Sequence, residues 1–176
     1  APVWLRVNPR RASVDAARAA LADERIETAP HDSLPTALRV TAGERRIAGS
    51  AAYRDGLVEL QDLSPQLACA HLPLSQGARV LDFCAGGGGK SLALAAREDL
   101  RLTAHDAAPA RMSDLPERAR RAGARIALSP PEKLGQGYDL IVTDVPCSGS
   151  GTWRRTPDAK WRLTREGLDE LRRTQA

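Results

Sequence analysis

The chain has 176 residues, which fits one domain of ordinary size or one small domain joined to part of another. Hydrophobic residues make up 42% and charged residues 27%, so a buried core is feasible and global disorder is disfavoured. The 26 Lys and Arg residues outnumber the 22 Asp and Glu residues, and this net charge of +4 favours a polyanionic partner over an acidic one. An Arg-rich composition from a GC-rich genome would give the same excess, so charge alone does not distinguish a polyanionic partner from a genomic bias.

The cysteines and the first residues of the chain limit the kinds of site and the cellular compartment that we expect. Cys69, Cys84 and Cys147 are odd in number and lie far apart, and no pattern has metal-ligand spacing. We therefore predict neither a disulfide framework nor a metal site. Without a signal peptide or a membrane-length apolar run, we expect a reduced, cytoplasmic setting and no membrane partner. The first residues are Ala-Pro and not Met, so we expect a fragment or a processed chain.

Residues 1–55 are expected to form a small α+β subdomain. Residues 3–7 alternate as in a strand, and residues 37–41 predict another. Ser13 is a candidate N-cap for a helix through about Leu21, in which apolar residues recur at helical spacing. A second domain is expected over residues 56–176.

This second part alternates between predicted strands and helices. A helix is expected to begin at Ser64, as its N-cap, followed by Pro65. Strands are predicted at residues 78–83, 100–105, 125–128 and 138–143. Helices are predicted at about 89–97, at 109–122 with an end at Gly123, and at 164–173 with Thr164 as the cap. Such alternation is typical of parallel βαβ units in an open, doubly wound α/β sheet.

A glycine-rich loop, Cys84-Ala-Gly-Gly-Gly-Gly-Lys90, follows the first of these strands and opens a helix. Glycine lets the backbone adopt positive φ and pass close to a ligand, and ligands bind at the carboxyl ends of strands in such sheets. The Walker A pattern fails because Cys84 replaces its first glycine, and the dinucleotide pattern fails because Ser91 replaces its last. The loop therefore predicts a nucleotide-like ligand of neither common class.

An acid closes the second predicted strand. Asp106 lies about 20 residues beyond the glycine loop, the offset at which an acid binds a ribose hydroxyl. An Asp at the end of a strand is also an ordinary helix cap, but the preceding glycine loop favours the ribose function. Together the two features indicate an adenosyl cofactor, with S-adenosylmethionine as the best candidate.

The fourth predicted strand runs into Asp144-Val-Pro-Cys147-Ser-Gly-Ser-Gly151, which brings an acid and a thiol to the same edge of the sheet. A thiolate beside a methyl donor indicates covalent catalysis on an electron-poor ring. Addition of a thiolate at C6 of cytosine makes C5 nucleophilic, and loss of the C5 proton after methylation expels the sulfur. A lone cysteine is most often a small buried apolar residue. We favour that explanation for Cys69 and Cys84, but not for Cys147.

With these motifs, the chain resembles the Sun-type (NOL/NOP/Sun) RNA cytosine-C5 methyltransferases, in particular their bacterial ribosomal RNA members. The resemblance covers nearly the whole chain, including residues 4–8 and 56–62, and is strongest from Asp144 to Trp161. It implies a Rossmann-like class I methyltransferase sheet, incomplete here with strands 1 to 4 in the order 3-2-1-4, preceded by the α+β subdomain. The fourth strand is then an exposed edge that can pair with another chain or with a missing C-terminal part. The resemblance also implies RNA, and ribosomal RNA in particular, as the partner.

The resemblance assigns roles to individual residues. For catalysis it implies Cys147, Asp144 and Lys90. For binding the cofactor it implies Cys84, Ala85, Gly86, Gly87, Gly88, Gly89, Lys90, Asp106, Arg111, Ser129 and Asp144. For RNA, through phosphate contacts and base stacking, it implies Arg154, Arg155, Lys160 and Trp161. A solvated Arg-rich surface, with Trp161 as a packing residue, explains this last group equally well.

The chain departs from the family pattern in three places. The usual Ala-Ala-Pro-Gly-Gly-Lys loop lacks its proline here, which predicts weaker cofactor binding because glycine costs more to order. In the family an acid near the end of the third strand usually contacts the adenine, whereas here Ser129 stands at about that position and can replace only part of the contact. The attacking cysteine of the family lies in a later Thr-Cys-Ser motif, which this sequence does not contain.

The absent motif changes the expected role of Cys147. In the family, the cysteine at this position is associated with resolving the covalent intermediate, whereas in DNA cytosine-C5 methyltransferases the Pro-Cys loop supplies the nucleophile. We therefore expect an RNA cytosine-C5 methyltransferase whose present chain is catalytically incomplete alone. The alternative is a non-catalytic RNA-binding or assembly module derived from the family. A DNA methyltransferase is disfavoured by the run from Arg154 to Trp161 and by the N-terminal region.

Overall fold

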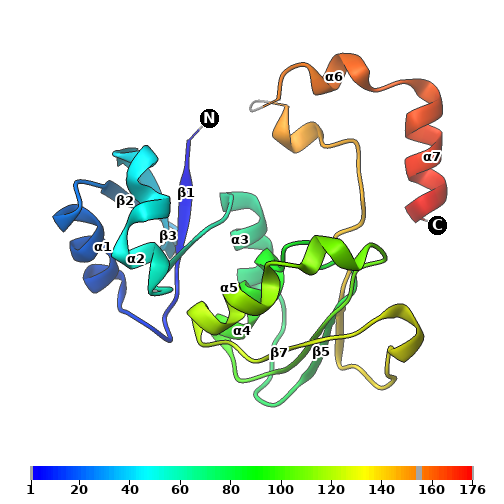
Figure 1. Ribbon diagram of the computed structural model, residues 1–176, viewed down its shortest axis with the longest axis horizontal. Helices are drawn as coiled ribbons and strands as arrows, with labels where there is room; N and C mark the ends of the chain where they lie inside the picture. Colours follow the sequence, from blue (N-terminus) through cyan, green and yellow to red (C-terminus); the bar gives the residue numbers. More distant parts are fainter. Residues whose placement is uncertain (1, 154–155, 176) are drawn as a thin grey trace. The chain divides into compact units, whose positions relative to one another are not determined.

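The computed structural model describes residues 2–153 and 156–175, which fall into two compact units that divide after Val142. The larger unit, Pro2–Val142, contains two four-stranded sheets (Figure 1). The smaller unit begins at Thr143 and contains the 3-10 helix η4 (Ser150–Thr152) and the helices α6 (Ala159–Arg162) and α7 (Arg165–Gln175).

The first sheet is antiparallel, with the order β2-β3-β1-β4. Its strands are β1 (Trp4–Val7), β2 (Glu27–His31), β3 (Leu34–Ala42) and β4 (Val58–Leu60). The sequence predicted β1 and β3 but missed the two outer strands. Pro30 makes β2 a poor strand by composition, and such a residue is tolerated at a sheet edge. Because β4 pairs with β1, the sheet itself extends past residue 55, and the division into domains at that point stays a prediction.

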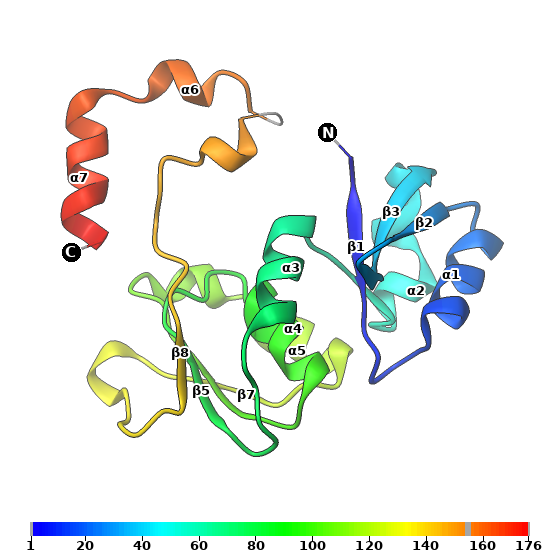
Figure 2. The ribbon, with the colours of Figure 1, turned by 180° about the vertical axis from the view of Figure 1, so that it is seen from behind.

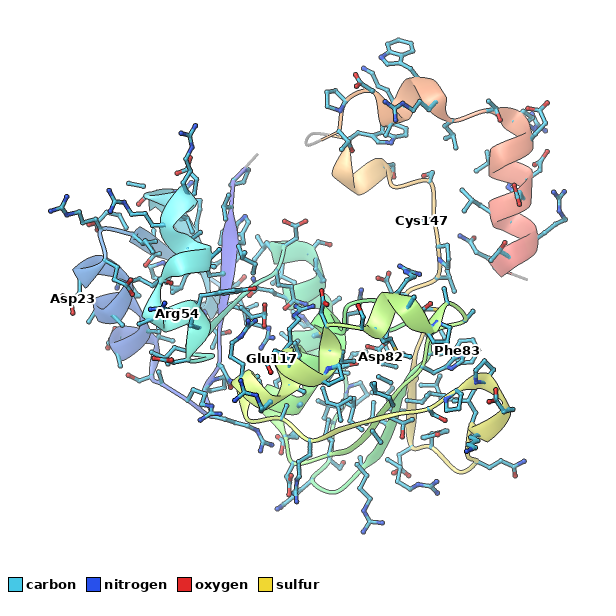
Figure 3. The ribbon with its side chains drawn as sticks, in the orientation of Figure 1. Asp23, Arg54, Asp82, Phe83, Glu117 and Cys147 are labelled. Carbon is cyan, nitrogen blue, oxygen red and sulfur yellow. The ribbon has the colours of Figure 1, made fainter. Side chains whose placement is uncertain are left out.

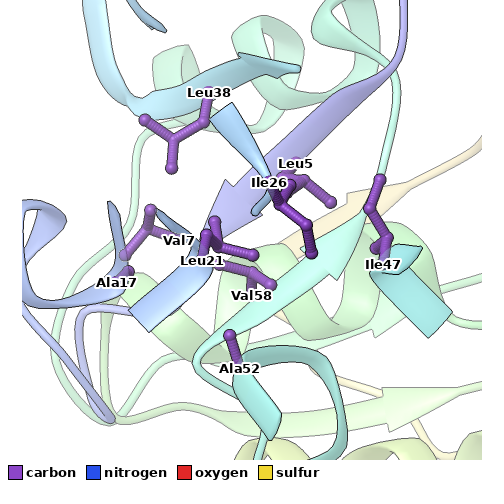
Figure 4. Close-up of a cluster of buried hydrophobic side chains, with 9 residues drawn as sticks. All are labelled: Leu5, Val7, Ala17, Leu21, Ile26, Leu38, Ile47, Ala52 and Val58. Atoms are coloured by element: carbon purple, nitrogen blue, oxygen red, sulfur yellow. The ribbon is translucent and has the colours of Figure 1, made fainter. Parts of the chain in front are cut away.

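The helices of this region cover one face of the antiparallel sheet. They are α1 (Val14–Asp23), the 3-10 helix η1 (Glu44–Gly49) and α2 (Ala51–Arg54). Ser13 caps α1 as predicted, since its hydroxyl accepts a hydrogen bond of 3.2 Å from the amide of Ala16. Alternate residues of β1 point to this side, and Leu5 and Val7 lie in a core of nine buried side chains (Figure 4).

The second sheet is parallel and confirms the predicted α/β topology. Its strands are β5 (Arg79–Asp82), β6 (Arg101–Ala104), β7 (Ile126–Leu128) and β8 (Leu140–Val142). The order β7-β6-β5-β8 is the predicted order 3-2-1-4 (Figure 2). Within residues 2–142, β8 pairs with β5 alone, and its Ile141 is 54% exposed. What this edge binds stays a prediction.

Three helices pack on one face of the parallel sheet and lie between the two sheets in both ribbon views (Figures 1 and 2). They are α3 (Leu63–His71), α4 (Gly89–Arg97) and α5 (Leu115–Ala122). The predicted bounds of α4 are confirmed. The predicted cap of α3 is wrong by two residues, because Asp62 is the N-cap and Ser64 and Pro65 lie in the first turn, where a missing amide is tolerated.

The single helix predicted at residues 109–122 is also wrong. The segment contains the 3-10 helix η2 (Pro109–Met112) and then α5, with Ser113 and Asp114 between them. Pro116 lies in the first turn of α5, where its missing amide costs no intrahelical hydrogen bond. Gly123 ends α5 with φ 67°, as predicted. A further 3-10 helix, η3 (Pro131–Lys133), precedes β8.

The C-terminal end of α5 contacts the antiparallel sheet closely. The Asn8 side-chain amide donates to the carbonyl oxygens of Ala122, at 2.8 Å, and Gly56, at 3.2 Å. Gly56 has φ 75°, and a Cβ atom placed on it would lie 2.2 Å from the carbonyl oxygen of Arg121. Glycine is therefore required at residue 56 both for its backbone conformation and for this approach.

We expect Gly56→Ala to destabilise the larger unit much more than Gly77→Ala. Gly77 also has φ 75°, but a Cβ atom there would meet nothing within 4 Å. Gly77→Ala should therefore lose only the cost of a left-handed backbone at alanine, roughly 1–2 kcal/mol. Gly56→Ala adds a clash with backbone, worth roughly a further 1–3 kcal/mol. Urea unfolding of both variants measures the difference, and equal losses would contradict the close packing.

Candidate functional site

The glycine loop leaves the carboxyl end of β5 and leads into α4. Gly86 has φ 51°, and Gly88, which caps α4, has φ 78°. A Cβ atom on Gly88 would lie 2.2 Å from Cδ1 of Leu115 in α5. At residue 88 the loop therefore needs glycine for its conformation and for its packing against α5.

Asp106 lies directly beside this loop. Its side chain is buried, and Oδ2 accepts a hydrogen bond of 2.9 Å from the amide of Gly86. Its other oxygen, Oδ1, accepts from the amide of Ala108 at 2.9 Å, and an Arg111 guanidinium nitrogen lies 3.3 Å from Oδ2. The structure thus brings together three features that the sequence singled out separately: the loop, Asp106 and Arg111.

Two residues that sequence reasoning missed fix the ends of the loop. The Asp82 side chain is fully buried at the end of β5, and its Oδ2 accepts a hydrogen bond of 2.7 Å from the Ser91 hydroxyl in the first turn of α4. Figure 3 labels Asp82 and its neighbour Phe83 at this end of the strand. The available signal was an acid that closes an otherwise apolar strand, nine positions before a serine at a helix start.

Ser129 lies at the carboxyl end of β7, next to a cavity. Its carbonyl oxygen is 3.0 Å from Nδ1 of the buried His105, whose ring packs 5.0 Å from that of Phe83. The cavity has a volume of about 280 Å³. Its lining is mainly apolar and consists of Pro109, Met112, Ser113, Pro116, Leu128, Ser129 and Pro130.

A larger cavity, of about 1020 Å³, lies elsewhere on the parallel sheet. Gly77, Asp99 and Leu100 line it, and these residues precede β5 and β6. It therefore reaches the amino ends of the strands, whereas the smaller cavity lies beside Ser129 at the carboxyl end of β7; residues of the glycine loop line neither cavity. Because ligands of such sheets bind at the carboxyl ends, we assign the site to the smaller cavity and the loop.

The three cysteines differ in their surroundings. Cys69 is buried in the core beside Val80 and Leu94, and burial raises the pKa of its thiol. The expectation of a buried apolar cysteine is therefore confirmed for Cys69. It is wrong for Cys84, which is half-buried in the glycine loop, as is Lys90 at the start of α4.

Cys147 lies on an exposed loop of the smaller unit (Figure 3). The amide of Gly149 donates to its sulfur at 3.5 Å, and Gly149 has φ 70°. The Gln175 side chain at the end of α7 donates to the carbonyl oxygen of Pro146 at 2.6 Å. Asp144 is exposed in the same loop. The predicted convergence of Asp144 and Cys147 with the glycine loop stays a prediction, because the two units are described separately.

The expected RNA-binding residues also belong to the smaller unit. Trp161 is 80% exposed, and the Lys160 ammonium lies 4.8 Å from its ring centroid. This exposure argues against the alternative in which Trp161 is a packing residue within its unit. Arg154 and Arg155 lie outside the described residues. Thr164 caps α7 as predicted, because its hydroxyl accepts a hydrogen bond of 3.1 Å from the amide of Gly167.

Metal-binding clusters and membrane-spanning helices are both absent from residues 2–153 and 156–175. In this part of the chain, no group of three or more His, Cys, Asp and Glu side chains is arranged to hold a metal ion. None of its helices combines the length and the apolar character needed to cross a bilayer.

Family models match both parts of the chain. A model described as "16S rRNA methyltransferase RsmB/F" matches residues 69–176, and one described as the ferredoxin-like domain of RsmF/B-like methyltransferases matches residues 1–45. The chain is 32% identical over 183 aligned residues to the ribosomal RNA small subunit methyltransferase B of Citrobacter koseri, an alignment that covers 99% of this chain and 42% of that relative.

Solved structures give the same result. The crystal structure of PH0851 superposes with a TM-score of 0.85 at 26% identity, covering 97% of this chain and 40% of that one. That of NSun6 from Pyrococcus horikoshii with SFG has a TM-score of 0.82 at 15% identity, covering 99% and 70%, and shows the fold alone. These matches confirm the resemblance drawn from the sequence, and the chain spans about two fifths of the curated relatives. This chain therefore belongs to the RsmB/F family of 16S ribosomal RNA methyltransferases.

Proposed function

We propose that this chain is the cofactor-binding part of an S-adenosylmethionine-dependent cytosine-C5 methyltransferase that acts on ribosomal RNA in the cytoplasm. The observation that carries the proposal is the contact between Asp106 and Gly86 at the carboxyl edge of the parallel sheet. A buried carboxylate is expensive to keep unless it is hydrogen-bonded, and here it stands beside a loop whose glycines keep side chains out of the space. Family membership supports methyl transfer to RNA.

The residues at this edge fit S-adenosylmethionine. Oδ2 of Asp106 is engaged by the Gly86 amide and by Arg111, whereas Oδ1 accepts the Ala108 amide and has a second lone pair, so a ribose hydroxyl can donate to Oδ1. The apolar cavity beside Ser129 would take the adenine ring, and residues 84–90 would hold the methionine part. When bound, the cofactor supplies an electrophilic methyl group.

The loop from Asp144 to Gly151 would carry the chemistry on the base. β5 and β8 are parallel neighbours, so the chain leaves both strands at the same edge of the sheet. We assign Cys147 to the release step: the C5 proton leaves, the C5–C6 double bond re-forms, and the bond between C6 and the attacking sulfur breaks. The attacking thiol would come from a Thr-Cys-Ser motif, which is absent from these 176 residues.

RNA contacts would come from the exposed face of α6 and its neighbours. Trp161 offers an exposed ring on which an unpaired base can stack, and Lys160 places a positive charge beside it for phosphate. Arg154 and Arg155 would add positive charge to the same stretch of the sequence. Sequence-specific RNA recognition commonly targets unpaired bases. This agrees with the proposed chemistry, because an enzyme can reach the ring of a target cytosine only when the base is out of the RNA duplex.

We expect Asp106→Asn to weaken binding of S-adenosylhomocysteine roughly 10-fold to 100-fold, because a hydrogen bond to a charged group contributes about 1.5–3 kcal/mol. Isothermal titration calorimetry measures the affinity. Asp99→Asn is the matched control, since the same change there affects an exposed carboxylate that pairs with Arg125. Its affinity should equal that of the unmodified chain.

The 2′-deoxy analogue of this ligand tests the ribose contact directly. If Asp106 binds the ribose, the unmodified chain discriminates against the analogue and Asp106→Asn loses that discrimination, so the two changes are not additive. Additive losses would assign Asp106 to loop structure alone. A chain that binds neither ligand would support the alternative, a non-catalytic RNA-binding module.

Cys147 is tested with RNA that carries 5-fluorocytosine, which traps the covalent adduct because fluorine cannot leave as a proton does. We expect neither an adduct nor methyl transfer from the 176-residue chain, with or without Cys147→Ala. In a longer form of the protein that includes a Thr-Cys-Ser motif, Cys147→Ala should retain adduct formation and accumulate adduct on ordinary RNA. Methyl transfer by the 176-residue chain that disappears with Cys147→Ala would make Cys147 the nucleophile. Denaturing gels and radiolabelled methyl donor give both readouts.

A further inference from the structure

Two carbonyl groups of the glycine loop are held by side chains that lead back to the antiparallel sheet. The Gln61 side-chain amide, just after β4, donates to the carbonyl oxygen of Gly89 at 3.1 Å. The Arg118 guanidinium of α5 donates to the carbonyl oxygen of Gly87. These contacts join segments 28 and 31 residues apart in the chain, so the loop is supported from outside its own βα unit.

Arg118 is itself fixed by Glu59 of β4. The Glu59 side chain is 7% exposed, and its two oxygens lie 3.3 Å from Arg118 and 3.0 Å from Arg121. Arg121 also lies over the Tyr53 ring, 4.2 Å from its centroid. If one of these side chains moved away, a buried charge would be left without its partner, which is strongly unfavourable. The ion pairs therefore keep the three side chains in place. Arg118 therefore links β4 to the loop through one guanidinium.

Gln61 is fixed in a similar way. Its side-chain oxygen accepts a hydrogen bond of 2.7 Å from Nε of Arg6 in β1, and its own carbonyl accepts one of 2.8 Å from Gln66 in α3. Arg6 is 7% exposed, and burial lowers its pKa to about 10 against the opposing effect of Glu59. With its oxygen engaged by Arg6, the amide of Gln61 can only present its nitrogen to Gly89.

A loop of consecutive glycines gains most from such support. Glycine loses more conformational freedom on ordering than any other residue, and this loop has no proline to restrict it. Because the peptide unit is planar, a held carbonyl at Gly87 fixes the N–H direction of Gly88, and one at Gly89 fixes that of Lys90. The second of these amides lies in the first turn of α4, where helix N–H groups face outward to a ligand.

We propose that Gln61 and Arg118 are positioning residues for the cofactor, through which β4 and its Glu59 hold the glycine loop in its ligand-binding shape. The antiparallel sheet is then a component of the cofactor site and not a separate RNA-binding attachment. This inference rests on the proposed function of the loop. It predicts that cofactor affinity depends on residues that never contact the cofactor.

Gln61→Glu is the sharpest test, because it keeps the size of the side chain and the acceptor for Arg6 but cannot donate to Gly89. Calorimetric titration of the 176-residue chain with S-adenosylhomocysteine should show roughly fivefold weaker binding, as for the loss of one hydrogen bond. Arg118→Met should weaken binding roughly tenfold. Arg118→Lys should recover part of this loss, because an ammonium can reach one of the two partners but does not replace the planar fork.

Arg120→Met is the matched control on the same helix, since Arg120 is exposed and pairs with the exposed Glu117. It should leave the affinity unchanged. Amide hydrogen exchange of the ligand-free chains separates positioning from general stability. Exchange should accelerate in residues 84–90 of Gln61→Glu and Arg118→Met, while β1 and β3 keep the protection of the unmodified chain. If Arg118→Met fails to fold, Gln61→Glu decides by itself.

The outcomes separate this inference from the function on which it rests. If the unmodified chain does not bind S-adenosylhomocysteine, the proposed cofactor site fails and this inference fails with it. If the unmodified chain binds, but Gln61→Glu and Arg118→Met bind within twofold of it, positioning by β4 is overturned while the proposed function stands. Uniformly faster exchange in both sheets would likewise overturn it, because the residues would then act on stability alone.

Discussion

Close packing of α5 against backbone is the constraint on which the larger unit depends. On one side Gly56 brings the chain so near to the carbonyl of Arg121 that no side chain fits, and Asn8 ties the last carbonyl of the helix to β1. On the other side Leu115 occupies the space that a side chain at residue 88 would need. Interiors packed at this density transmit displacements, so α5 cannot shift relative to one sheet without disturbing the other.

This packing explains why the glycines are not interchangeable. Gly56 and Gly88 both have positive φ, and at both positions a Cβ atom would lie closer to another element than van der Waals contact allows. Gly77 has the same backbone conformation and faces open space. The chain therefore uses glycine for two separate reasons, conformation and proximity, and only the second depends on residues far away in the sequence.

Local signals predicted a good part of this structure. The bounds of α4, the cap at Ser13 and the stop at Gly123 follow from patterns within a few residues, whereas the strand order follows from the family resemblance, and each is confirmed. The failures have physical reasons. The outer strands β2 and β4 are stabilised by pairing with β3 and β1 and not by their own composition, and the split of residues 109–122 depends on a 3-10 turn.

The candidate site divides along the same line. The loop and Asp106 could be predicted from their spacing, and Arg111 from the family resemblance. The supports at Glu59, Gln61 and Arg118 could not, since their partners are distant in sequence, and the contact between Ser91 and Asp82 forms only when the strand and the helix pack together. The side-chain contacts that hold the loop also restrict which N-terminal regions can be exchanged between related proteins. A recombination event that exchanged the N-terminal region up to residue 55 would leave Glu59 and Gln61 with their α5 and loop partners, but would replace Arg6. A hybrid that folds correctly would therefore need compatible residues at positions 6 and 61. The region before residue 55 and the segment that follows it are thus constrained to change together.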